Sequence, residues 1–194
     1  MPTNEKDRDP LQRGQEARES AESYEAFCKR YLPRVTRYLI SLASDTGMAE
    51  DAAQETLIAA NIKWGEVRTY ERPDSWLFTV ATRKLRRMEA QARERSSLRE
   101  DLASVEDDLR IAATTDKWVE DHIDLVAAVR LLPRRQCEVI GLHYLVGYTL
   151  AETAQILGIE QGTAKQHLHR GLTFLRQHHY DPARVAGSGR KIPV

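Results

Sequence analysis

The chain has 194 residues, of which 41% are hydrophobic and 30% charged, and its formal net charge is zero. This composition suits one medium or two small globular domains and argues against a uniformly basic nucleic-acid-binding protein. No apolar run approaches the roughly 20 residues that span a bilayer, so we expect no membrane insertion. The polar segment 1–22 also lacks the apolar stretch of a signal peptide, which favours a cytoplasmic protein.

Catalytic and metal-binding patterns are missing from the sequence. Cys28 and Cys137 are too far apart for a disulfide framework or a zinc spacing, so we interpret both as small buried hydrophobes. The six histidines show no metal spacing, apart from a weak alternative at the His178-His179 pair. With no nucleophile–base pair and no glycine-rich phosphate loop, we expect neither enzyme activity nor a cofactor.

The first half of the chain predicts three helices. Residues 1–22 are charged and are expected to be disordered. Apolar residues then recur at three- and four-residue steps over 24–42, where Pro33 predicts a kink or two abutting helices. A turn at 45–47 leads to a second helix over 48–64. The third helix is expected over 75–95, with Asp74 as its N-cap and with an inner face formed by Trp76, Leu77, Val80, Ala81, Leu85 and Met88.

The second half predicts an acidic linker and four further helices. Residues 96–121 are rich in carboxylates and only weakly periodic, which is typical of a solvated linker. Apolar periodicity returns at Ile123 and is broken by Pro133, and the next helix is expected to end at Gly147. No segment alternates as a strand would, so the fold is predicted to be all-α, with two small helical domains joined by the linker.

Residues 149–176 predict a helix-turn-helix. Thr149 and Glu152 fit a capping box, Gly158 ends the first helix, and a longer helix follows over 161–178. Such a second helix enters the DNA major groove, where Gln can bond adenine and Arg or Lys can reach guanine or phosphate. Its outward side is predicted to carry the −35 DNA-binding set Thr163, Lys165, Gln166, His169 and Arg170.

These motifs resemble those of extracytoplasmic-function (ECF) sigma factors of bacterial RNA polymerase. The segments Leu132-Pro133, 148–158 (YTLAETAQILG) and 162–165 resemble the domain that reads the promoter −35 element. The segment 49–56 (AEDAAQET) resembles the helix that grips the clamp coiled coil of core polymerase, and 76–81 (WLFTVA) resembles the start of the helix that helps to open the −10 element. The order and combination of the three motifs are typical of this family.

The resemblance implies a role for each part of the chain. It assigns 23–95 to polymerase-clamp and −10 element binding, and 122–180 to −35 element binding. The acidic linker 96–121 and the tails 1–22 and 181–194 lie outside these domains. It implies core RNA polymerase and promoter DNA as partners, an anti-sigma factor as a candidate third partner, and association with the nucleoid.

Two residue sets complete the predicted site. The polymerase-binding set lies on one face of the second helix, where exposed isoleucines beside carboxylates suit a partner helix that bears arginines: Asp51, Gln54, Glu55, Ile58 and Ile62. The −10 DNA-binding set combines a loop whose rings and guanidinium groups can stack on an unpaired base with arginines that can contact phosphates: Arg68, Tyr70, Arg72, Trp76, Arg83, Arg86 and Arg87.

The chain departs from the family pattern at two −10 positions. Family members usually carry an asparagine and an aspartate where this chain has Arg83 and Arg87. Two alternatives therefore stand beside the sigma factor hypothesis. One is an ordinary DNA-binding activator with a helical sensing domain, and the other is a sigma-like regulator that occupies polymerase without initiating transcription.

Overall fold

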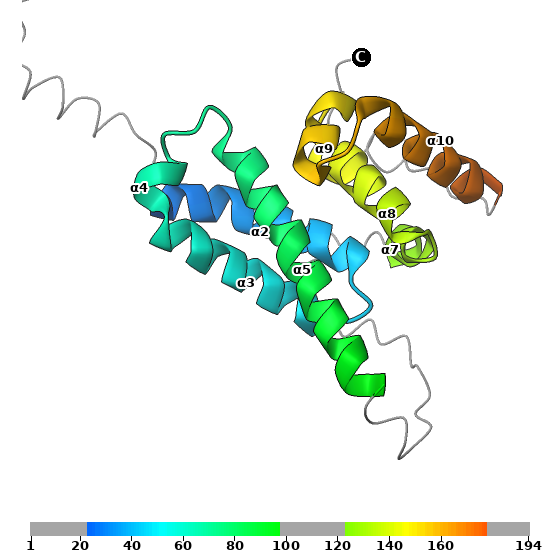
Figure 1. Ribbon diagram of the computed structural model, residues 1–194, viewed down its shortest axis with the longest axis horizontal. Helices are drawn as coiled ribbons and strands as arrows, with labels where there is room; N and C mark the ends of the chain where they lie inside the picture. Colours follow the sequence, from blue (N-terminus) through cyan, green and yellow to red (C-terminus); the bar gives the residue numbers. More distant parts are fainter. Residues whose placement is uncertain (1–22, 98–122, 178–194) are drawn as a thin grey trace, which may run out of the picture.

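The computed structural model describes residues 23–97 and 123–177. Within these two ranges every regular element is helical, which confirms the all-α prediction. The helices form a first lobe, α2 to α5, and a second lobe, α7 to α10, which face each other in Figure 1. Most of the predicted linker and both predicted tails lie outside the described residues.

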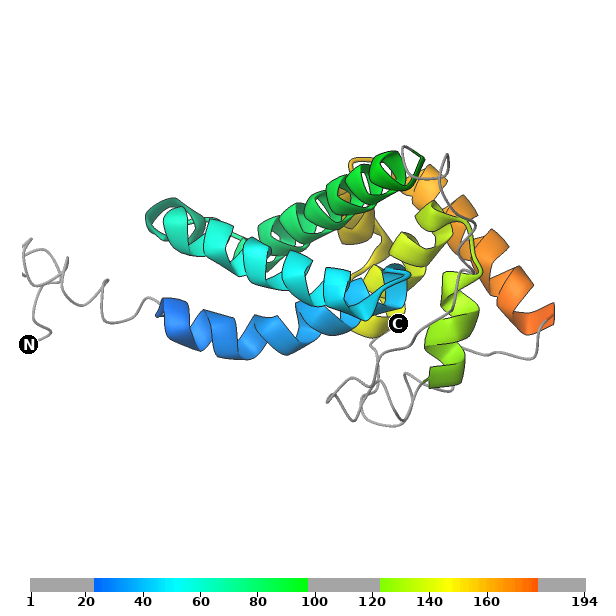
Figure 2. The same cartoon turned by 90° about the horizontal axis from the view of Figure 1, so that it is seen from below.

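The first lobe begins with two helices that pack along each other (Figure 2). α2 (Tyr24–Leu42) starts at the N-cap Ser23, and α3 (Thr46–Ile62) starts at the N-cap Asp45, whose carboxylate accepts a hydrogen bond from the Gly47 amide at 2.7 Å. Our interpretation of two abutting helices around Pro33 is wrong, because α2 runs through this residue as one element. The Pro33 ring lies on the exposed side of α2, where tertiary packing does not meet it.

A short helix and a long one complete the first lobe. α4 (Trp64–Val67) places the Trp64 ring 5.0 Å from that of Phe27. α5 (Pro73–Ser97) begins one residue before Asp74, so Asp74 lies in the first turn and is not the N-cap that we expected. Proline is favoured at this first position because its missing N–H would have no helical partner there.

The second lobe contains the predicted helix-turn-helix. α7 (Ile123–Arg130) and α8 (Arg134–Ile140) are separated at Pro133 as expected, and α8 continues into an unpredicted π-helical turn, η2 (Gly141–Val146). α9 (Leu150–Leu157) and α10 (Gln161–Gln177) follow. Positive φ angles of 91° at Gly147 and 64° at Gly158 end η2 and α9 where the sequence predicted these ends.

The two lobes share one apolar core. α2 packs against α7, α8 and η2, and α5 packs against α9. Phe78 is fully buried although it lies outside the predicted inner face of α5, because its ring meets that of Tyr148 from the second lobe at 5.5 Å. α5 is therefore covered on two sides. No helix in the described ranges combines the length and the apolar character needed to cross a bilayer.

Candidate polymerase and promoter interfaces

The outer face of α3 presents the predicted polymerase-binding set. Small residues, among them Ala49, Ala52 and Ala60, line the opposite side of the helix and are buried against α2 and α5. All five predicted residues are exposed, and the side chains of Ile58 and Ile62 have exposed fractions of 58% and 79%. We call the five residues the α3 outer face: Asp51, Gln54, Glu55, Ile58 and Ile62.

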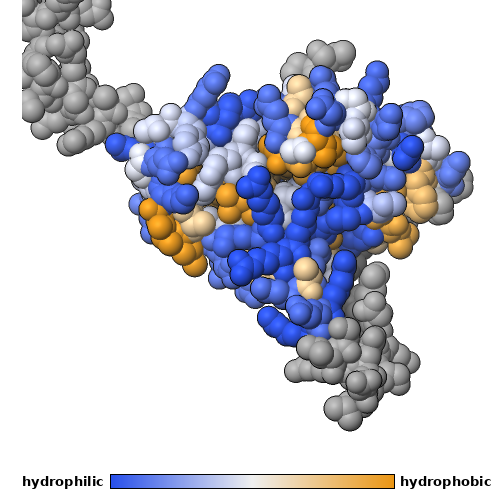
Figure 3. All heavy atoms as spheres, in the orientation of Figure 1, coloured by the Kyte–Doolittle hydropathy of each residue, from blue (hydrophilic) through white to orange (hydrophobic). Residues whose placement is uncertain are grey.

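Apolar surface on this face has no partner within the described chain. Figure 3 shows an apolar patch at the edge of the molecule where the end of α3 approaches α4, and Ile62 is the last residue of α3. Burying a side chain such as isoleucine contributes about 1.5–3 kcal/mol, so two of them beside carboxylates can anchor an amphipathic partner. Glu55 contacts Lys84 at 2.9 Å, but such a surface pair contributes less than about 1 kcal/mol.

The loop before α5 holds part of the predicted −10 set. Arg68 is exposed, and the half-buried rings of Tyr70 and Trp76 lie 6.5 Å apart. The Tyr70 hydroxyl donates a hydrogen bond to Glu66, which raises the pKa of this tyrosine. The structure thus brings the two rings together, and the exposed Arg68 lies two residues before Tyr70 in the same segment.

Arg72, from the same loop, is held by carboxylates of both lobes. Its Nε and Nη2 donate to the two oxygens of Asp74 at 3.2 Å, and its Nη1 contacts Glu152 of α9. The hydrogen bonds to Asp74 and, second in size of effect, to Glu152 raise the pKa of the Arg72 guanidinium group above its ordinary value. The Tyr148 hydroxyl also donates to Asp74, at 2.7 Å. In this arrangement the guanidinium group faces the second lobe.

The arginines of α5 point in different directions. Arg83 and Arg87 are exposed. Arg86 instead turns toward the second lobe, where its Nε donates to Glu138 Oε1 at 2.7 Å. Burial lowers the pKa of Arg86, but the hydrogen bond and charge of Glu138 outweigh it and the net shift is upward. The three α5 arginines of the predicted −10 set are therefore divided between solvent and the contact between the lobes.

The helix-turn-helix presents the predicted −35 set on one side of α10. The capping box at the start of α9 is formed, with the Thr149 amide donating to Glu152 Oε2 at 2.8 Å and the Glu152 amide donating to Thr149 Oγ1 at 3.3 Å. Ala164, Gly171 and Leu175 are buried on the inner side of α10. Five polar residues are exposed on its outer side, where four of them border a shallow hollow next to Gly162: Thr163, Lys165, Gln166, His169 and Arg170.

This outer side suits DNA. α10 carries no carboxylate along its length, so nothing on the helix itself repels a phosphate backbone. Its exposed groups include the amide and the cations that bond base edges in the major groove. Among the described residues, no cluster of three or more His, Cys, Asp or Glu side chains could hold a metal ion.

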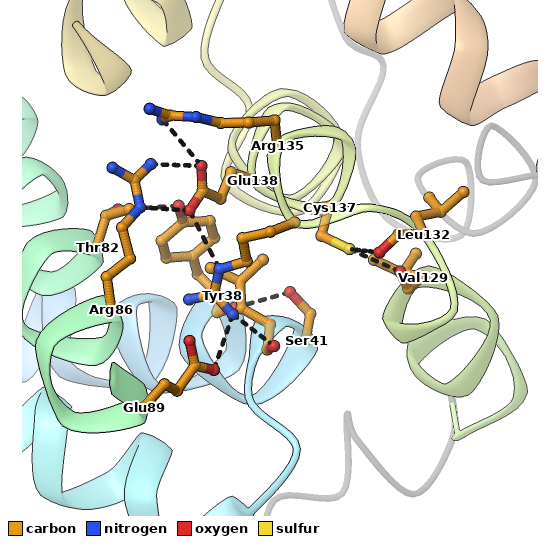
Figure 4. Close-up of polar contacts among 12 residues, drawn as sticks. Tyr38, Ser41, Thr82, Arg86, Glu89, Val129, Leu132, Arg135, Cys137 and Glu138 are labelled. Atoms are coloured by element: carbon orange, nitrogen blue, oxygen red, sulfur yellow. Dashed lines mark hydrogen bonds and ion pairs between the residues drawn. The ribbon is translucent and has the colours of Figure 1, made fainter. Parts of the chain in front are cut away.

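Sequence reasoning missed the carboxylate that the second lobe places against the first. Glu138 is fully buried, and Arg86, Arg134 and Arg135 surround it (Figure 4). One signal existed, since Glu138 stands in the otherwise apolar stretch 137–142. A buried carboxylate requires cationic partners, and here Arg134 and Arg135 come from α8 itself while Arg86 comes from α5.

Two family models match the two lobes. The model of sigma-70 region 2 matches residues 27–95, and the model of sigma-70 region 4 matches residues 122–175. The chain is 32% identical over 144 residues to the ECF RNA polymerase sigma factor SigL of Mycobacterium tuberculosis, covering 72% of this chain and 79% of SigL. It is 28% identical to the ECF RNA polymerase sigma factor BldN of Streptomyces coelicolor, covering 84% of this chain and 63% of BldN.

A solved structure agrees with these relatives. The sigma factor RpoE from Bartonella quintana, crystallised in complex with the anti-sigma factor NepR, superposes with a TM-score of 0.65 at 25% identity. The match covers 86% of this chain and 98% of RpoE, and so includes both lobes. These relatives do not favour the alternative of a sigma-like regulator that does not itself initiate transcription. The chain belongs to the ECF sigma factors of RNA polymerase, the promoter-recognising factors of transcription initiation.

Proposed function

We propose that three surfaces of the chain carry the binding functions of a sigma factor, one for core polymerase and one for each promoter element. The α3 outer face binds the clamp of core RNA polymerase. The loop 68–72, Trp76 and the arginines of α5 bind the −10 element, and the outer side of α10 reads the −35 element. Residues 23–95 and 122–180 act as the two functional domains, joined by the linker 96–121. The family acts by binding, and we propose that this chain likewise has no catalytic activity.

The main support for this proposal is the pair of exposed isoleucines on α3. Ile58 and Ile62 lie one helical turn apart on the same face, with Asp51, Gln54 and Glu55 on the preceding turns. An apolar centre with an acidic rim fits a partner helix that carries apolar and cationic side chains. The sequence of this helix also resembles the clamp-binding helix of the family, so surface chemistry and resemblance agree.

The other partners follow from the family and its solved member. Because RpoE was crystallised with the anti-sigma factor NepR, we include an anti-sigma factor among the proposed partners. Promoter binding would place the protein in the cytoplasm at the nucleoid. The arginines at positions 83 and 87 provide charge for phosphate contacts beside the −10 element.

Run-off transcription tests the proposal. Purified core polymerase is incubated with genomic fragments, with and without this protein, and discrete new transcripts are expected only when the protein is present. Aligning their start sites gives the −10 and −35 sequences. If core polymerase bound the protein but no transcript appeared, the assignment of the −10 set would be wrong.

A matched pair of variants tests the α3 outer face. Asp51→Ala with Glu55→Ala removes two exposed carboxylates from it, and we expect binding to core polymerase to weaken by at least tenfold while thermal stability is retained. Glu25→Ala with Glu160→Ala removes two exposed carboxylates outside the α3 outer face and the loop 68–72, and we expect it to leave binding unchanged. Equal affinities of the two double variants, measured by fluorescence anisotropy, would contradict the assignment.

A further inference from the structure

The helix that presents the −35 set contains two glycines, and the fold requires only one of them. At Gly171 a Cβ atom would lie 2.6 Å from Ile140 Cδ1 of α8, so the packing of α10 on α8 excludes a side chain. At Gly162 a Cβ atom would have no neighbour within 4 Å. Packing within the described chain therefore gives no reason for glycine at position 162.

The backbone gives no reason for glycine at position 162 either. Among the glycines of the described ranges, only Gly147 and Gly158 have positive φ angles, so Gly162 has the ordinary helical conformation of α10. A glycine within a helix costs about 1 kcal/mol of stability relative to alanine. Glycine is also the residue used where a ligand approaches the backbone closely. Such an approach would explain this position.

Gly162 belongs to the row of residues that faces outward from α10. Lys165, Gln166, His169 and Arg170 follow it at three, four, seven and eight residues, and these spacings share one face of a helix. All five residues are exposed, and together they line the shallow hollow on this helix. α10 runs along the outside of the second lobe in both cartoon views (Figure 1 and Figure 2). The hollow thus lies where the missing side chain interrupts the row.

The chemistry at the glycine end of the hollow favours an apolar group of a base. Glycine has no side-chain donor or acceptor, so it makes room for a base but cannot bond its polar edge. The apolar group that base pairs present in the major groove is the 5-methyl group of thymine. Lys165 and Arg170 can add the aliphatic stems of their side chains around a methyl group while their charged ends reach outward.

We propose that the hollow at Gly162 receives the 5-methyl group of a thymine in the −35 element. The bare backbone lets α10 approach the base until the methyl group is in van der Waals contact. Gln166 lies one helical turn further on, about 6 Å along the helix axis, and can bond an adenine within about two base pairs of that thymine. This inference rests on the −35 assignment of the proposed function.

Matched changes in the DNA and in the protein test the inference. Each thymine of the −35 element, identified from the run-off start sites, is replaced in turn by uracil, which forms the same base pair but lacks the 5-methyl group. Gly162→Ala adds a Cβ atom to the hollow, and Gln177→Ala at the exposed end of α10 is the control. Holoenzyme is formed from core polymerase and each variant, and its binding to these promoter duplexes is measured by fluorescence anisotropy.

We expect one uracil substitution to weaken binding by the unsubstituted chain about fourfold, which is the effect of one buried methyl group. In Gly162→Ala the added Cβ atom and the base methyl group compete for the same space. The thymine duplex should therefore bind more weakly, and the uracil duplex should recover most of the loss. The preference for thymine at this position is then lost or reversed, whereas Gln177→Ala keeps it. Unfolding in urea should show that Gly162→Ala is folded and at least as stable as the unsubstituted chain.

Two results would overturn the inference. The first is an unsubstituted chain that binds thymine and uracil duplexes equally at every position. The second is a Gly162→Ala chain that keeps the preference for thymine, whatever its overall affinity. Failure of the proposed function is distinguishable, because Gln166→Ala and Arg170→Ala would then also leave the affinity for the duplex unchanged. If α10 reads the −35 element without a methyl contact, these two variants still weaken binding.

Discussion

The two cysteines differ in burial and therefore in the reactivity of their thiols. Cys137 is only 3% exposed, and its thiol donates to the carbonyl groups of Val129 at 2.9 Å and Leu132 at 3.1 Å. Burial raises the pKa of the Cys137 thiol to about 11, so at pH 8 it stays protonated and unreactive. Cys28 is only partly buried. We expect Ellman's reagent at pH 8 to titrate one thiol rapidly and Cys28→Ser to remove that phase. A rapid thiol that survives in Cys28→Ser would refute the protection of Cys137.

Neighbouring residues of α10 should differ in what they recognise. Gln166 can form a bidentate contact with adenine, whereas Lys165 at the flank suits a phosphate. Gln166→Ala is therefore expected to cost about 1–3 kcal/mol and to relax selectivity at one −35 base pair. Lys165→Ala should weaken all sequences alike and lower the salt dependence. Transcription from single-base promoter variants at two salt concentrations separates these effects, with Gln177→Ala, at the end of α10, as the control. Identical base preferences for all three variants would contradict the assignment.

At the scale of elements, one close contact sets how α10 sits on α8. A Cβ atom on Gly171 would lie 2.6 Å from Ile140 Cδ1, and Ile140 is itself only 1% exposed. Overpacking of this kind costs about 1–3 kcal/mol, which exceeds the gain of about 1 kcal/mol from replacing a helical glycine. We expect Gly171→Ala to lower the free energy of unfolding in urea. Gly162→Ala meets no atom within 4 Å and should leave stability unchanged or raise it. Equal stability of the two variants would show that the contact relaxes at no cost.

Short-range signals in the sequence predicted where helices begin and end better than they predicted which residues the rest of the fold buries. The capping box at Thr149 and the glycine at Gly158 are short-range features, and both are confirmed. Of the two alternatives predicted at Pro33, a kink or two abutting helices, the second is wrong, because α2 continues through this residue as one helix. The buried states of Phe78 and Glu138 depend on contacts between lobes, with Arg86 and Glu138 52 residues apart. Periodicity within one helix cannot reveal which polar residue a distant element will cover.

At the scale of the molecule, the shared core determines how the chain unfolds. Apolar residues of both lobes form one cluster, and the rings of Phe78 and Tyr148 meet across the boundary. Separation of the lobes would uncover the side of the Tyr38 ring that faces Gly141 and would remove Arg86 from Glu138. Elements whose polar and apolar contacts depend on each other unfold together. The free chain should therefore behave as one cooperative unit although its family uses the two halves on separate promoter elements.

Calorimetry can measure this coupling directly. We expect one unfolding transition for the unsubstituted chain and for the control Gly65→Gln, whose Cβ atom would have no neighbour within 4 Å, with calorimetric and van't Hoff enthalpies in agreement. A Cβ atom on Gly141 would lie 3.0 Å from the Tyr38 ring of α2, so Gly141→Gln pushes the lobes apart at this contact, and the transition should divide into two or broaden. The lobe with fewer remaining contacts then melts at the lower temperature. Two transitions in the unsubstituted chain would mean that the lobes fold independently, and the glycine contact would then contribute to docking but not to stability.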